Sequence, residues 1–292
     1  MIRLSMGRRV FVVANYAFLS ILAILCIFPV VHELAISFSS ADAISAGKVN
    51  FWPIGFTTSA YEFTLQKDEF IHATGISLLR VLLGCSLNML LTLLIAFPLS
   101  KESVLKFRTG YVWYFVFTML FSGGMIPGYL IVKNLGLIDS IWALVLPGAV
   151  PIFNVVLMLN FFRGLPKELE EAAFMDGAGY LTSLFRIYAP LSLPVLATTG
   201  LFTIVTHWNT WFDGLIFMNS MQHYPLSTYL QTVVVNMNLG SMSLEQLQQF
   251  QVVNQQNAKA AQVFLSIVPI MAIYPFLQKY LVQGMVIGGV KE

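Results

Sequence analysis

Long apolar runs separated by short polar segments dominate this sequence. Residues 10–31, for example, form 22 consecutive positions without a charged side chain, too long an apolar region for a signal peptide and therefore interpreted as a retained span. About 20 apolar residues in a helix cross roughly 30 Å of hydrocarbon, where backbone polar groups need partners within their own segment. The pattern predicts six transmembrane helices, at residues 10–36, 73–100, 109–132, 140–162, 194–217 and 260–287.

Composition narrows the class further. Of the 292 residues, 57% are apolar and only 10% are charged, against about 25% charged in a soluble domain. The chain is therefore predicted to be an all-α integral membrane protein. A dispersed net charge of +2 gives no sign of nucleic-acid binding. Cys26 and Cys85 both lie within apolar runs, so a packing role is favoured over a disulfide framework or a thiolate metal site.

The basic residues predict the orientation in the membrane. Cytoplasmic segments are enriched in Lys and Arg, and one side of the predicted topology carries eleven of them against four on the other. Both termini and the polar segment 166–194 are therefore expected in the cytoplasm. Two outer segments, 37–72 and 219–259, are long. Their content is typical either of contact with an outside protein or of a solvated cap over helix ends.

The segment 166–194, called the polar insert below, has the sequence signals of a helix. Pro166 suits a first helical position, and the acidic residues after it suit the positive end of a helix. Asp176-Gly177 signals a turn. A helix of about ten residues is marginal in water, so another surface is expected to stabilise it.

Polar residues also occur at helical spacing inside two predicted spans. In the fifth span they recur at intervals of 4, 3, 4 and 3, with Asn209 at the edge of the stripe. The stripe consists of Thr199, Thr203, Thr206, Thr210 and Asp213, and the similar stripe of the second span of Ser77, Arg80, Gly84, Asn88 and Thr92. Such stripes either pack helices together or line a water-filled pathway. A charged Arg80 indicates either a functional site or snorkelling to the interface.

Recognisable catalytic chemistry is absent from the sequence. No lysine precedes Ser or Thr, which rules out a Walker A phosphate loop. His32-Glu33 begins a zinc-protease motif, but Ile36 occupies the position of its second histidine. Neither catalysis nor a metal or cofactor of its own is expected of this chain.

A resemblance to a known family rests on the polar insert. Glu171-Ala172-Ala173, then Gly177 and Ile187-x-Ala189-Pro190, closely resemble the EAA signature of ABC-importer permeases, EAA-x3-G-x9-I-x-L-P. Only Ala189 departs from it. The similarity extends from about residue 51 to the C-terminus and includes HWNTWFDGLIFM and YPLSTYLQ. The chain is most similar to carbohydrate-importer permeases of the MalG-like type, in the branch for lipo-oligosaccharides, alginate and other complex saccharides.

The resemblance implies a type-I ABC importer permease fold with six transmembrane helices and cytoplasmic coupling helices. It implies an N-terminal helix and outer loop at 1–72 and a permease domain at 73–292, with the coupling loop at about 163–193. Glu171 would contact a separate ATPase, Ala172 and Ala173 would permit close approach, and Gly177 would form the turn. The coupling residues implied are Glu171, Ala172, Ala173, Asp176, Gly177, Ile187 and Pro190.

The resemblance also implies the partners. Two ATP-binding subunits would hold ATP and Mg, a second homologous permease subunit would form a heterodimer, and an extracytoplasmic binding protein would deliver an oligosaccharide, such as an alginate-like oligouronate. The protein would reside in the bacterial inner membrane. The expected substrate pathway consists of Asn209, Asp213, Thr203, Thr206, Thr210, Asn88 and Arg80. The alternative is a self-contained secondary carrier or channel with a regulatory cytoplasmic loop.

Overall fold

The computed structural model describes residues 6–101, 105–235 and 255–289, and within these ranges the regular structure is entirely helical. Residues 236–254 of the outer segment 219–259 therefore lie outside the described residues. The helices are α1 (Met6–Ser37), α2 (Ala41–Ser45), α3 (Ser59–Leu65), α4 (Asp68–Ser100), α5 (Arg108–Leu120), α6 (Met125–Asn134), α7 (Ile141–Val145), α8 (Ile152–Arg163), α9 (Glu168–Met175), α10 (Tyr180–Ser183), α11 (Ala189–Leu191), α12 (Leu193–Asn209), α13 (Phe212–Phe217), α14 (Leu226–Val235) and α16 (Gln255–Gly289), with a π-helix η1 (Leu184–Tyr188) and a 3₁₀ helix η2 (Met221–His223).

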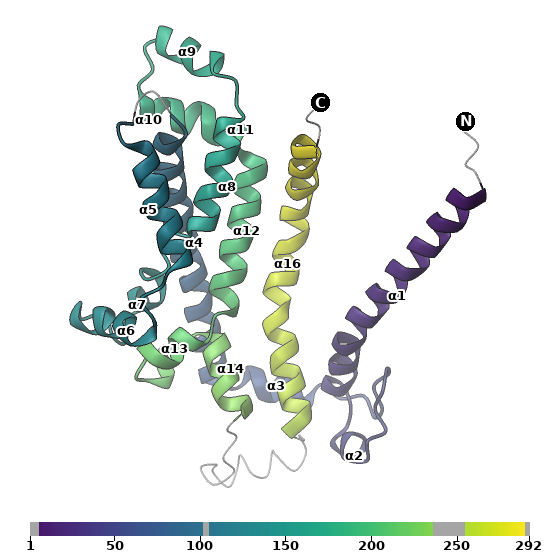
Figure 1. Cartoon of the computed structure of the whole chain (residues 1–292). Coiled ribbons are helices and arrows are strands. Elements are labelled where there is room, and N and C mark those ends of the chain that lie inside the picture. The colour runs from purple at the N-terminus through teal and green to yellow at the C-terminus, as the bar shows by residue number, and fades with distance from the viewer. Residues whose placement is uncertain (1–5, 102–104, 236–254, 290–292) are drawn as a thin grey trace. The chain divides into compact units, whose positions relative to one another are not determined.

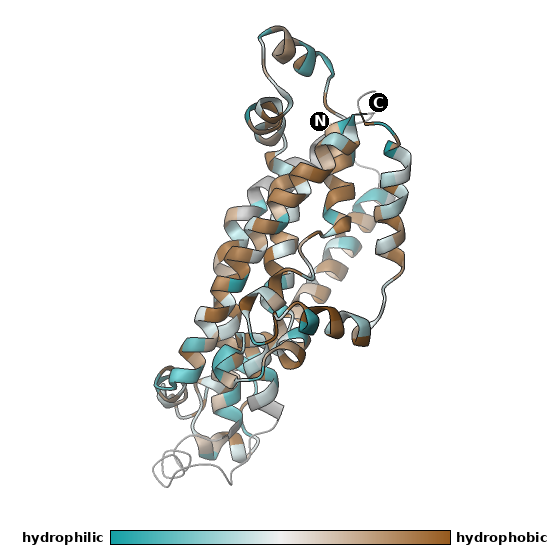
Figure 2. Ribbon diagram, turned by 90° about the vertical axis from the view of Figure 1, so that its left-hand side faces the viewer, coloured by the Kyte–Doolittle hydropathy of each residue, from teal (hydrophilic) through white to brown (hydrophobic). Residues whose placement is uncertain are grey.

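The predicted count of six spans is not confirmed. Among the described residues, three helices are long and apolar enough to cross a membrane: α1, α4 and residues Gln256–Phe276 of α16. The count rises to five if two bent pairs each form one span. These pairs are α5 with α6, bent by 110°, and Tyr180–Leu191 with α12, bent by 84°. In Figure 2 the long helices are mostly hydrophobic along their length, as a lipid environment requires.

Glycine and proline explain where the predicted spans break. The expected helix 109–132 divides between α5 and α6, where Gly124 adopts a positive φ of 87°. The expected helix 140–162 divides into α7 and α8, with Pro151 immediately before α8. At 12 residues, α8 is roughly 18 Å long, shorter than the hydrocarbon layer.

The chain forms two compact units, each with its own packing. The first contains α1, α2, α3 and the start of α16 up to Val268. Here α3 packs against α16 through Ala60, Phe63, Ala258 and Ala261. The amide of Asn257 adds a hydrogen bond to the carbonyl of Ser39. These contacts tie the start of α16 to the segment between α1 and α3.

The second unit runs from Glu69 through α14 and includes the chain from Pro269 onwards. Its largest buried cluster joins one end of α4 to α8 and η1. Phe97, Phe162 and Tyr188 form its aromatic centre, with Phe97 and Phe162 each meeting Tyr188 edge to face, at ring-centroid distances of 5.1 and 5.5 Å. In Figure 1, α9 lies beyond this end of α4, α8 and α12, whereas α6, α7 and α13 lie toward the opposite end.

Candidate functional site

The polar insert folds as two short helical arms, of which its sequence signals predict the first and the family resemblance implies the pair. Its first arm is α9, which begins at Glu168, two residues after Pro166, and carries three glutamates in its first turn. The arm ends at Gly177, whose φ of +80° is a left-handed conformation that suits glycine. The Gly177 and Ala178 amides donate to the carbonyls of Phe174 (3.0 Å) and Ala173 (2.9 Å), closing the end of the helix.

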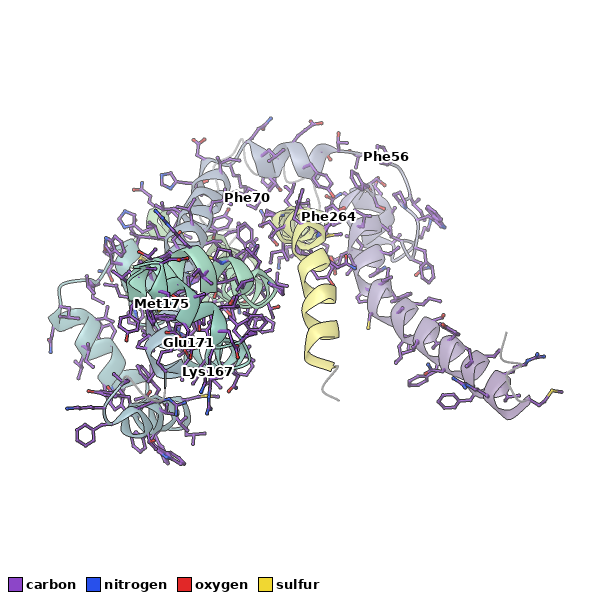
Figure 3. The ribbon with its side chains drawn as sticks, turned by 90° about the horizontal axis from the view of Figure 1, so that it is seen from above. Phe56, Phe70, Lys167, Glu171, Met175 and Phe264 are labelled. Atoms are coloured by element: carbon purple, nitrogen blue, oxygen red, sulfur yellow. The ribbon has the colours of Figure 1, made fainter. Side chains whose placement is uncertain are left out.

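The two faces of α9 differ in exposure. Glu171 and Ala172 are exposed, and Met175 is 87% exposed, whereas Ala173 is buried against the chain itself. Figure 3 shows Lys167, Glu171 and Met175 on this insert, viewed from above. The outward face therefore offers a carboxylate, a small residue and an exposed apolar side chain to a partner. Ala173 instead permits close packing within the chain.

The second arm of the insert is continuous with the hydrophobic core. It consists of α10, η1 and α11, and it turns by 84° into α12 at Ser192. Ile187 packs against the cluster of α4 and α8, while Pro190 is exposed at the beginning of α11. A displacement of this arm would therefore act directly on α12 and on the core.

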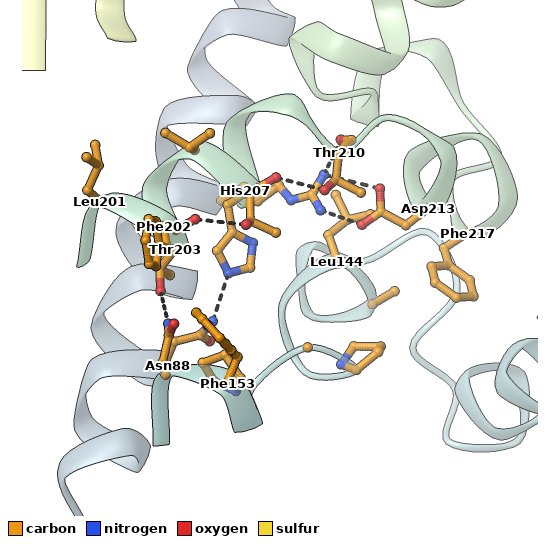
Figure 4. Close-up of a pocket in the computed structure, with 18 residues that line it drawn as sticks. Asn88, Leu144, Phe153, Leu201, Phe202, Thr203, His207, Thr210, Asp213 and Phe217 are labelled. Carbon is orange, nitrogen blue, oxygen red and sulfur yellow. Dashed lines mark hydrogen bonds and ion pairs between the residues drawn. The ribbon is translucent and has the colours of Figure 1, made fainter. Parts of the chain in front are cut away.

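A cavity of about 760 Å³ lies within the second unit, among α4, α7, α8, α12 and α13. Its volume falls within the range of small-molecule sites. Six of the seven expected pathway residues line it: Arg80, Asn88, Thr203, Thr206, Thr210 and Asp213 (Figure 4). Asn209 is exposed and lies outside the lining. Phe153, Phe202 and Phe217 supply aromatic surface to the same cavity.

A buried ion pair fixes one wall of this cavity. The two terminal nitrogens of Arg80 bind the two carboxylate oxygens of Asp213, and Nη1 also donates to the Thr210 carbonyl at 2.9 Å. The side chain of Arg80 is only 3% exposed. The expected possibility that Arg80 snorkels to the interface is therefore wrong, because a carboxylate and a carbonyl within the protein satisfy its charge.

The polar stripe of the fifth span is not carried by one continuous helix. α12 ends at Asn209, Thr210 is extended (φ −69°, ψ 121°), and Asp213 belongs to α13. The Thr210 carbonyl, released from the helix, accepts hydrogen bonds from Arg80 and from Ser227 Oγ (2.8 Å). The predicted helix 194–217 is interrupted here because these two side chains provide the bonds that a continuing helix would have made.

Two further polar residues, Asn154 and His207, line the cavity and were not predicted from the sequence as pathway residues. Asn154 of α8 donates to Thr203 Oγ1 at 3.1 Å and to the Thr199 carbonyl at 3.4 Å. His207 of α12 is 5% exposed, and its Nδ1 has no hydrogen-bond partner within the described part of the chain. A polar residue within an otherwise apolar run was the available signal for Asn154.

Asn88 connects α4 to the loop before α8. Its amide nitrogen is best placed to donate to the carbonyls of Gly84 (2.9 Å) and Ala149 (3.3 Å). Figure 4 marks the 3.4 Å contact between the Asn88 side-chain amide and His207 Nε2, at which this orientation places the amide oxygen. Gly84 also faces the His207 ring, so closely that a Cβ atom there would overlap it. The small residue thus sets the distance between α4 and α12.

Asp139 attaches the loop before α7 to the segment after α13. Its carboxylate contacts His223 Nδ1 at 2.9 Å and accepts from the Asn219 amide at 3.0 Å. The hydrogen bond with His223, followed by that from Asn219, lowers the pKa of Asp139 below its ordinary value. This exposed contact holds α13, and with it Asp213, against the rest of the cavity wall.

The fold and these two sites define a multi-pass membrane protein with an exposed helical insert and an internal polar cavity. The chain belongs to the family described as "binding-protein-dependent transport system inner membrane component", whose model matches residues 86–287. That membership makes it a transport permease and excludes the alternative of a self-contained secondary carrier or channel.

Individual relatives match over nearly their full length. The chain is 35% identical to the polygalacturonan/rhamnogalacturonan transport system permease protein YtcP of Bacillus subtilis, over 98% of this chain and 100% of that protein. It is 38% identical to protein LplC of the same organism, over 97% and 95% of the two chains. Among solved structures, it resembles a chain of a bacterial ABC transporter involved in the import of the acidic polysaccharide alginate, with a TM-score of 0.89, 29% identity and coverage of 96% and 100%.

Proposed function

We propose that this chain is a permease subunit of an ATP-driven importer for an oligosaccharide, and that its polar insert couples the movement of ATP-binding subunits to alternating access. The observation that carries the proposal is the exposed face of α9, where Glu171 and Ala172 have no covering element in the described chain. An eight-residue helix is too short to persist alone in water, which fits a helix that docks on another subunit.

The proposal includes the other subunits of the importer. Two ATP-binding subunits supply ATP and Mg, a second homologous permease completes the membrane part as a heterodimer, and an extracytoplasmic binding protein delivers the cargo. The excess of basic residues near the insert and both termini supports a cytoplasmic location for all three. The absence of a Walker A sequence supports an external source of ATP hydrolysis.

The names of the relatives support a saccharide cargo, and those for polygalacturonan and alginate support an acidic one. Within the cavity, however, Arg80 is neutralised by Asp213, and the remaining polar lining is mostly hydroxyl and amide. We propose that this subunit contacts the hydroxyl groups of the cargo. A sugar carboxylate would find no unpaired lysine or arginine among the residues that line this cavity.

The coupling role is tested by Glu171→Lys and Gly177→Pro in the reconstituted importer. Proline cannot adopt the φ of +80° found at Gly177 and removes the amide that donates to Phe174. Both variants are expected to insert normally but to lose uptake and transport-coupled ATP hydrolysis. Glu69→Lys, which places the same charge change on an exposed residue at the start of α4, away from the insert, is the control. Normal uptake by both variants would refute the coupling role.

A further inference from the structure

A second glutamate of α9 is turned toward the protein. Glu170 binds Lys101 Nζ, just after the end of α4, and the two side chains are only 13% and 12% exposed. Its neighbours Glu168 and Glu171 are both exposed. The helix therefore divides its acidic residues between an outward face and one internal contact.

Tyr188 of η1 completes this contact. Its hydroxyl accepts a hydrogen bond from Lys101 Nζ and donates to Glu170 Oε2 at 3.2 Å. Lys101 Nζ also lies 4.0 Å from the centroid of the Tyr188 ring and 4.9 Å from that of Phe97, within the range of a cation–π interaction. Three polar groups and two aromatic rings thus share one site, called the Lys101 joint below.

The joint is anchored in the most buried part of the second unit. Tyr188 is 2% exposed and contacts Phe97 of α4 and Phe162 of α8 edge to face. Lys101 and Glu170 are 69 residues apart in sequence, so their contact connects elements that are otherwise distant along the chain. In such a poorly solvated site, charge-assisted hydrogen bonds are stronger than they are in water.

We propose that Lys101, Glu170 and Tyr188 are positioning residues that transmit movement of α9 to α4 and to the η1–α12 segment. This inference rests on the proposed coupling function and deepens it. Without the joint, α9 would be held by the linkers 164–167 and 176–179, by the packing of Ala173 and by the contact of Phe174 with Tyr180 of α10. None of these contacts reaches the end of α4 by a charged group, so rotation of the short linkers would absorb much of a movement at Glu171. With the joint, the movement reaches the end of α4 directly.

The test compares matched substitutions in the complete, reconstituted importer. Glu170→Gln removes the internal charge, and Glu69→Gln makes the same chemical change at an exposed position at the start of α4, away from the insert. Lys101→Met is paired in the same way with Lys106→Met, which alters an exposed lysine. Uptake, ATP hydrolysis and the amount of co-purifying ATP-binding subunit are measured for each variant at matched membrane levels.

Glu170→Gln and Lys101→Met are expected to retain the ATP-binding subunits but to lower the uptake per ATP hydrolysed by about tenfold, a typical size for coupling between sites. The two control variants should remain close to wild type. The double variant should be no worse than the more severe single variant, because both remove one interaction. Lys101→Arg, which keeps a cation beside Glu170 and the two rings, should restore most of the coupling.

Two results would overturn the inference. One is a Glu170→Gln importer that couples as well as the Glu69→Gln control. The other is loss of the ATP-binding subunits from Glu170→Gln, which would make Glu170 a docking residue and not a transmitter. Failure of the proposed function would look different, because the wild-type chain itself would then purify without an ATP-binding subunit, and both proposals would fall together.

Discussion

Arg80 of α4 and Asp213 of α13, 133 positions apart in the chain, form a bidentate salt bridge at the wall of the cavity. Removing one partner leaves the other charge poorly solvated, whereas removing both does not. The pair therefore couples the position of a long membrane helix to that of a short helix at its side.

The first prediction concerns this pair. Asp213→Asn is expected to lower the free energy of unfolding of the purified complex by about 2 kcal/mol. Breaking a fully buried ion pair costs ~3–5 kcal/mol, and the smaller loss is expected because the Asp213 side chain is 21% exposed. Arg80→Gln combined with Asp213→Asn should recover much of the loss. Thermal unfolding of the detergent-solubilised complex measures both. A double variant that is less stable than either single variant would contradict this account.

Gly84 provides a second prediction, because its missing side chain makes room for His207. Gly84→Ala should destabilise the protein by about 1–3 kcal/mol, since α4 or the His207 ring has to move. Gly75→Ala is the matched control on the same helix, where nothing lies within 4 Å of an added Cβ. Helix propensity alone should make the control neutral or about 0.5–1 kcal/mol more stable. Equal melting temperatures for the two variants would show that the close approach is unimportant.

Asn154 is predicted to matter for the cavity although it belongs to an apolar helix. Asn154→Leu removes its hydrogen bonds to Thr203 and Thr199, at a cost of about 1–2 kcal/mol, and places an apolar side chain in the lining. Uptake should fall while recruitment of ATP-binding subunits is unchanged. Asn160→Leu, at an exposed position of α8, should leave uptake intact. Loss of uptake in both variants would indicate a general effect on α8.

Cysteine accessibility tests whether the cavity belongs to a water-filled pathway. In a background with Cys26→Ser and Cys85→Ser, Thr206→Cys is expected to react with a water-soluble thiol reagent, because Thr206 is exposed and lines the cavity. Thr203→Cys, buried at 3% exposure, should react more slowly in the resting state and faster during transport. If both positions stay unreactive in every transport state, the stripe serves packing.

The uninterrupted elements were the most predictable part of the fold. Helices α1 and α4 begin a few residues before the apolar runs predicted for them, and each continues through an internal proline, Pro29 or Pro98. The polar insert was predictable as well, because local signals such as Asp176-Gly177 determine its turn. Glycine and proline in the other runs were visible in the sequence, but hydropathy alone did not reveal that they break a span.

The contacts between the site residues were less predictable from the sequence. The polar stripe identified most of the cavity lining but not its partners, because the register between α4 and α12 depends on the packing of Gly84 against His207. Similarly, Glu170 and Glu171 are adjacent acidic residues with no local signal to distinguish them. Only the position of Lys101 after α4 reveals that one of them faces inward.

The end of α12 has a consequence for how this family member could change shape. Arg80 of α4 lies at the C-terminal end of α12, which is the negative end of the helix dipole, and donates a hydrogen bond to the Thr210 carbonyl there. If α4 slid along α12 by one turn, about 5.4 Å, the cation would leave that carbonyl and Asp213 together. The point at which α12 ends therefore depends on the register of α4 against it. We expect the two helices to tilt together as one rigid unit.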